Sequence, residues 1–162
     1  MPSVNPGPAA LITPQTEAML APQNSGSSLV TPLGLGALRI IGIIKGLNLS
    51  GTGDVATITI NNANPWVAVN VAFGNALVNG VSGSVAAANL GIFTGAGATG
   101  TTVRTAGVLT GMTGSTVFLT AAAASAAVIS TAQTLYVNQT VAVAGGTVDV
   151  YVYGYDLSPY SP

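Results

Sequence analysis

The run Thr147-Val148-Asp149-Val150-Tyr151-Val152-Tyr153-Gly154-Tyr155 decides the fold. Its valines alternate with an aspartate and three tyrosines, which is the period of a β-strand whose two faces meet different surroundings. We expect the valine face to point into a core. The other face admits two interpretations, because Tyr151, Tyr153 and Tyr155 either cover the sheet as ordinary strand residues or form an interface.

A second run, residues 66–73, alternates in the same way. We predict that one face of this strand is buried, and it consists of Val67, Val69, Val71 and Phe73.

Short apolar runs separated by Gly, Asn, Ser and Thr continue this pattern through the rest of the chain from Leu38 onward. We predict an all-β domain over residues 37–162, folded as a jelly-roll-like antiparallel β-sandwich of about eight strands. The expected strands are residues 38–49, 55–61, 66–73, 89–94, 101–105, 115–120, 134–139 and 147–155. The alanine-rich residues 121–130 are expected to form a short helix or turn, with an irregular packed loop as the alternative.

Residues 1–36 differ from the rest because they hold six of the nine prolines and a single charge, Glu17. Proline fixes φ and donates no backbone hydrogen bond, so we predict an extended, Pro-rich N-terminal arm. A disordered tail is the alternative. The apolar residues between the prolines are candidate contacts with a neighbouring subunit, and they include Leu11, Ile12, Leu20, Leu29, Val30, Leu33 and Leu35.

Charge is scarce, because 4% of the residues are charged where a soluble domain has about 25%. Histidine and cysteine are absent, which removes the commonest general base, the commonest transition-metal ligand and the thiolate nucleophile. We therefore expect no enzyme and no metal or cofactor; a hydrolase or lyase on a β scaffold is the alternative of a different class. Three cations are too few to bind nucleic acid. The longest apolar run, residues 117–129, is shorter than the roughly 20 residues that span a membrane.

Three local motifs have simple structural interpretations. Residues 95–100 match G-x-G-x-x-G, but a strand-like run follows and no acid lies about 20 residues on, so we predict a hairpin loop. Asp54 is predicted to lie in a turn. Lys45 is expected to reach solvent from its apolar strand, with a nucleophilic lysine or an isopeptide bond to an asparagine as the alternative.

Several stretches resemble the small virion proteins of tailed bacteriophages. They are residues 134–137, the closing run at 145–157 with its D-V-Y-V-Y-G pattern, and the glycine-rich strand and loop at 90–103. That group includes capsid decoration, or cement, proteins. The resemblance implies a β-sandwich that trimerises on the outer surface of the virion, binds the major capsid protein and stabilises the shell by bridging capsomers. A head-fibre or tail-associated protein that binds a receptor or glycan is the alternative.

The scarcity of charge predicts that the isolated protein is an oligomer, because seven charged groups cannot cover the surface of a monomer of 162 residues. Analytical ultracentrifugation at micromolar concentration checks this expectation. A stable monomer at that concentration would contradict it.

Overall fold

The structure is a computed structural model that describes residues 38–60, 65–114, 118–122 and 129–157. These residues form nine strands and no helix: β1 (Leu38–Asn48), β2 (Gly53–Thr59), β3 (Trp66–Val78), β4 (Val81–Ser82), β5 (Asn89–Gly95), β6 (Thr99–Val108), β7 (Phe118–Ala122), β8 (Thr134–Val141) and β9 (Gly146–Asp156). The predicted arm lies outside the described residues, as do residues 123–128 of the expected helix. The start of that segment was predicted wrongly, because Ala121 and Ala122 belong to β7.

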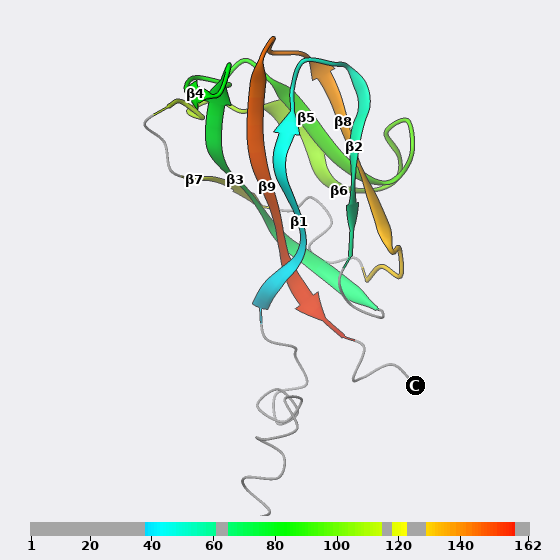
Figure 1. The fold of residues 1–162 in the computed structure, drawn as a ribbon. Helices are drawn as coiled ribbons and strands as arrows, with labels where there is room; N and C mark the ends of the chain where they lie inside the picture. Colours follow the sequence, from blue (N-terminus) through cyan, green and yellow to red (C-terminus); the bar gives the residue numbers. More distant parts are fainter. Residues whose placement is uncertain (1–37, 61–64, 115–117, 123–128, 158–162) are drawn as a thin grey trace, which may run out of the picture. The chain divides into compact units, whose positions relative to one another are not determined.

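The strands form two antiparallel sheets that pack face to face (Figure 1). The front sheet has the order β1-β9-β3, with β7 and β4 beside the far edge of β3, and the back sheet has the order β2-β8-β5-β6. Apart from the short β4, the pairs nest inward along the chain: β1 with β9, β2 with β8, β3 with β7 and β5 with β6. Nested antiparallel pairs of this kind are typical of a jelly roll, in which a long hairpin folds over into two sheets. The predicted jelly-roll-like sandwich is therefore confirmed.

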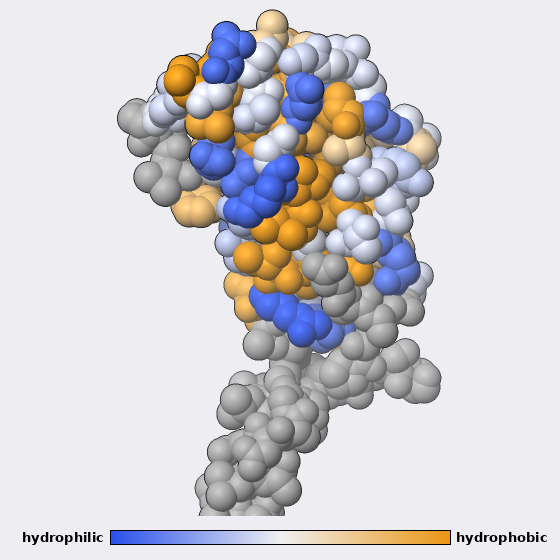
Figure 2. All heavy atoms as spheres, in the orientation of Figure 1, coloured by the Kyte–Doolittle hydropathy of each residue, from blue (hydrophilic) through white to orange (hydrophobic). Residues whose placement is uncertain are grey.

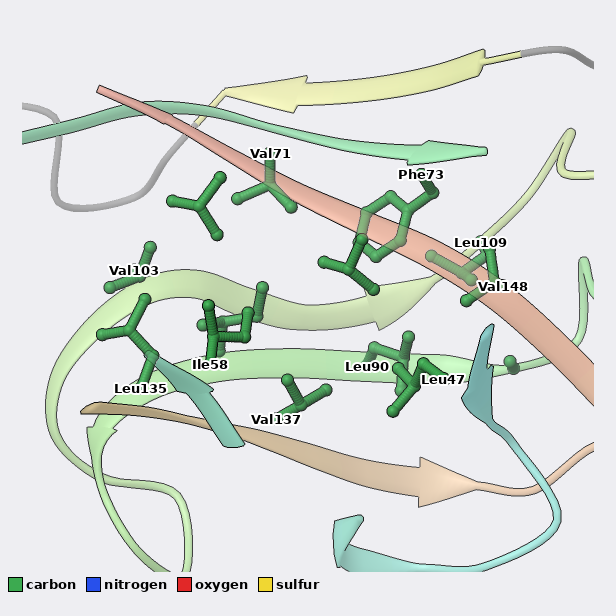
Figure 3. Packing of buried hydrophobic residues seen from close by; sticks show 14 of the residues in the cluster. Leu47, Ile58, Val71, Phe73, Leu90, Val103, Leu109, Leu135, Val137 and Val148 are labelled. Carbon is green, nitrogen blue, oxygen red and sulfur yellow. The ribbon is translucent and has the colours of Figure 1, made fainter. Parts of the chain in front are cut away.

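The core lies between the two sheets. Val148, Val150 and Val152 are fully buried, which confirms the predicted inward face of β9. In Figure 3, Phe73 and Val148 of the front sheet point toward Leu90 of the back sheet. Each such side chain contributes about 1.5–3 kcal/mol by leaving water, so the two inner faces hold the sheets together.

The predicted inward face of β3 is half right. The structure buries the following residues of this strand between Trp66 and Phe73: Trp66, Ala68, Val71, Ala72 and Phe73. Val67 and Val69, which were expected inside, are half-buried. The cause is a β-bulge, because the pairing of β3 with β9 shifts register between Ala68 and Asn70. One extra residue moves every later side chain to the opposite face.

Arg104 of β6 lies in the core, which the sequence did not predict. Its residue surface is 7% exposed, its guanidinium donates to the carbonyl oxygens of Leu90 and Gly107, and its central carbon lies 4.9 Å from the centre of the Phe73 ring. Burial lowers the pKa of the guanidinium, yet arginine stays protonated in proteins. This cation therefore joins the back sheet to an aromatic ring of the front sheet.

The glycine-rich run is a hairpin loop, as predicted, because it joins the adjacent strands β5 and β6. The N–H of Gly97 donates to Oδ2 of Asp54 at 2.6 Å, and Nδ2 of Asn138 donates to Oδ1 at 2.9 Å. The Asn138 and Gly97 bonds together hold the pKa of this carboxyl below its ordinary value. The expected turn position of Asp54 was wrong, since Asp54 lies in β2, where it fastens the loop to the back sheet.

Gly154 of β9 is required by the close approach of β3. A Cβ at this position would press against the carbonyl oxygen of Val67 and lie 2.8 Å from Cδ1 of Ile41. We expect Gly154→Ala to lower the free energy of unfolding by about 2 kcal/mol. Gly107→Ala is the matched control, because its new Cβ would lie 3.7 Å from the nearest atom, Nη2 of Arg104.

Urea unfolding followed by the fluorescence of the single tryptophan measures both variants. Equal unfolding midpoints for the two alanine variants would contradict this account of Gly154.

Candidate functional site

The outward side chains of β9 are in register with those of both neighbouring strands. The cross-strand rows are Ile43-Tyr151-Ala72, Ile40-Tyr153-Asn70 and Leu38-Tyr155-Val67. On β7, Phe118 extends the surface, since its ring centre lies 5.7 Å from that of Tyr151, and Thr120 pairs with Ala72. We call these three rows, together with Phe118 and Thr120, the tyrosine face.

Large apolar side chains of the tyrosine face are exposed. Their exposed fractions are 53% for Leu38, 41% for Ile40, 38% for Ile43 and 54% for Phe118. Figure 2 shows apolar residues grouped along β1, with hydrophilic groups nearer to its two ends. Contiguous apolar surface on a soluble protein usually marks a binding surface. Of the two interpretations of the tyrosine row, this arrangement favours an interface.

A hollow of ≈ 280 Å³ lies within the tyrosine face. It is lined by residues of β1, β3, β7 and β9, namely Leu38, Asn70, Ala72, Phe118, Thr120 and Tyr153. The Oδ1 atom of Asn70 is buried and accepts no hydrogen bond from any described residue. A buried acceptor without a donor costs about 1–3 kcal/mol of stability.

An ion pair borders the tyrosine face beside Tyr151. Asp149 is buried, and its carboxylate accepts the N–H of Gly46 at 2.8 Å, Nζ of Lys45 at 3.0 Å and the hydroxyl of Tyr151 at 3.3 Å. Gly46 has a φ of +61° within the irregularity where β1 slips against β9. This bulge brings a backbone donor to a carboxylate that its strand directs outward.

These contacts settle the protonation of both partners. Burial raises the pKa of Asp149, but the Gly46 N–H and the Lys45 ammonium outweigh it and hold the pKa below its ordinary value. The hydroxyl of Tyr151, followed by Asp149, raises the pKa of Lys45. Lys45 reaches solvent, as expected, with 62% of its side chain exposed. A protonated amine is not a nucleophile, so its geometry is that of a paired surface cation.

A second ion pair, between Arg39 and Asp156, lies where β1 begins and β9 ends. Both pairs are neutral in sum, so the four charges around the tyrosine face leave it without net charge. Exposed pairs of this kind add little stability. Because each pair is neutral, no unpaired charge borders the apolar surface between them.

Comparisons with protein-family models, curated proteins and solved structures found no match. Among the described residues, no three His, Cys, Asp or Glu side chains form a group able to hold a metal ion. The same part of the chain has no helix that is long and apolar enough to cross a bilayer. The tyrosine face is the candidate functional site.

The structure places the predicted interface residues as follows. Tyr151, Tyr153 and Tyr155 lie together on the tyrosine face. The predicted arm contacts lie outside the described residues, namely Leu11, Ile12, Leu20, Leu29, Val30, Leu33 and Leu35. Ile40, Ile43 and Phe118 were not predicted, because their place on the face follows from strand pairing and not from any local motif.

The lowered pKa values of Asp149 and Asp54 predict how stability depends on pH. Each ionised carboxylate stabilises the folded state fully above its unfolded pKa of about 4, and this stabilisation is lost as pH falls through the lower folded pKa. We expect the free energy of unfolding to fall as the pH drops from about 4.5 to lower values. Asp149→Asn should make the free energy of unfolding depend less on pH, because it removes one of the two carboxylates with a lowered pKa.

Urea unfolding at several pH values in that range provides the measurement. Asp54→Asn is the companion variant, because it removes the other carboxylate with a lowered pKa. A pH dependence unchanged by Asp149→Asn would mean that the Gly46 and Lys45 bonds do not stabilise the fold.

Proposed function

We propose that this chain is a structural protein of a tailed-phage virion, which binds the outside of the capsid as an oligomer and stabilises the shell by bridging capsomers. The observation that carries the proposal is the tyrosine face, a neutral and largely apolar surface on one sheet of a rigid sandwich. The resemblance of the closing strand to phage virion proteins supports the same role.

The exposed apolar side chains of the tyrosine face favour contact with another surface. Covering the exposed Leu38, Ile40 and Phe118 with another surface lowers the free energy by roughly 25 cal/mol per Å² of apolar area. A protein that is covered after assembly tolerates such a surface, whereas a free monomer loses solubility. Cementing a shell needs rigid sheets and complementary surfaces and no catalytic group.

The proposed partners are the major capsid protein and further copies of this chain, in a trimer on the virion surface. Cryo-electron microscopy of the virion tests the location. Density that bridges capsomers supports the cement role, and density at a vertex or tail tip would instead indicate the head-fibre or tail-associated role.

Salt distinguishes an apolar contact from an electrostatic one. At 1 M salt, charges separated by more than about 3 Å are screened, while apolar burial persists. We expect attachment to particles to survive molar salt and to fail in mild denaturant, as measured by co-sedimentation. Release by salt alone would contradict an apolar interface.

A charge placed in the tyrosine face should weaken assembly. We expect Phe118→Lys to reduce oligomer formation and particle binding by at least about tenfold, because burying an unpaired ammonium is costly. Val108→Lys is the matched control, since Val108 of the back sheet is 52% exposed and Phe118 is 54% exposed.

Ultracentrifugation measures self-association, and co-sedimentation with particles measures attachment. Circular dichroism confirms that both lysine variants are folded. Equal losses for the two variants would show that the tyrosine face has no special part in assembly.

A further inference from the structure

We propose that the tyrosine face of one copy binds residues 29–35 of the N-terminal arm of a neighbouring copy. This inference rests on the oligomer of the proposed function and names the contact that holds it together. The segment reads Leu29-Val30-Thr31-Pro32-Leu33-Gly34-Leu35.

The chemistry of the segment matches that of the face. The segment has no charged residue and has large apolar side chains at Leu29, Leu33 and Leu35. The face has exposed apolar residues, and both bordering ion pairs are internally neutral. Contact between the two surfaces therefore buries no unpaired charge. The interface avoids the free-energy cost of such burial.

The hollow is large enough for side chains of a peptide. Its volume of ≈ 280 Å³ lies at the lower limit of the roughly 300–1,000 Å³ typical of small-molecule sites. It suits one or two aliphatic anchors.

Proline and the aromatic rings of the face are also complementary. Proline-rich segments bind grooves lined by aromatic side chains, because their extended conformation is already restricted before binding. Pro32 lies at the centre of the segment, and the hollow is bordered by the rings of Tyr153 and Phe118. Because Pro32 fixes its own φ before binding, the segment loses less chain entropy on binding than it would without this proline.

The position of Leu38 explains why the acceptor is a neighbouring copy. Leu38 lines the hollow and is the first residue of β1, so each arm is joined to the chain at the rim of a tyrosine face. Residues 29–35 of the same copy are separated from Leu38 by only Gly36 and Ala37. A segment arriving from a neighbour has no such restriction, and copies arranged around an axis can exchange arms in turn.

Disulfide trapping in the full-length chain tests the contact. Because the sequence has no native cysteine, disulfides can form only between the introduced residues. The test variant carries Leu33→Cys and Thr120→Cys, since Thr120 is exposed and lines the hollow. The matched control carries Leu33→Cys and Thr57→Cys, because Thr57 is an exposed residue of the back sheet. Each single-cysteine variant is oxidised in parallel.

We expect the Leu33→Cys/Thr120→Cys variant to form covalent dimers and larger species at least about tenfold more than the control and the single variants. Intramolecular disulfides in monomers would place the arm on its own copy and overturn the proposal. Dimers of the Thr120→Cys variant alone would mean that two tyrosine faces pack together. Cross-linking equal to the control would show that residues 29–35 do not bind the face.

The experiment contains no capsid, so its outcome is separate from that of the proposed function. Disulfide trapping without particle binding would support the arm contact and reject the cement role. Particle binding without disulfide trapping would support the cement role and reject the arm contact.

Discussion

The pairing of β9 with β1 on one edge and β3 on the other is the constraint on which the structure depends. Because side chains alternate along a strand, this pairing puts Val148, Val150 and Val152 into the core and the tyrosines outside. Across the irregularities in both pairings, each tyrosine stays aligned with outward residues of both neighbours. Core and candidate interface are therefore two faces of one pairing, and a slip of one residue would destroy both.

The few charged residues of the described chain stabilise particular geometries. Arg104 crosses the core to the Phe73 ring, and Asp149 accepts the N–H that a bulge in β1 presents. Asp54 fastens the β5–β6 loop to the back sheet. Each of these groups sits where the regular ladder is interrupted or where two elements meet. Most of the remaining surface is neutral, which suits a protein that other surfaces cover.

Much of the fold was predictable because it follows from local alternation. Most predicted ends lie within a few residues of the observed ones for the strands at 38–49, 66–73, 134–139 and 147–155. The signals for these strands are local, because apolar residues at a period of two are followed directly by glycine-rich turns. The inward assignment of Val67 and Val69 failed, because the bulge after Ala68 depends on the partner strand. Arg104 was missed for a related reason, because its buried partners come from β5, from a later residue of β6 and from the opposite sheet.

The sequence by itself determined the all-β class, the inward valines of β9 and the outward row of tyrosines, because these need only a two-residue period. Tertiary structure alone decided that Ile40, Ile43 and Phe118 join this row and that Asn70 lies in a hollow among them. The reason is that a strand's own residues set which face each side chain takes. Its neighbours are set by the register of pairings between segments about 45 to 115 residues apart, and no local pattern encodes them.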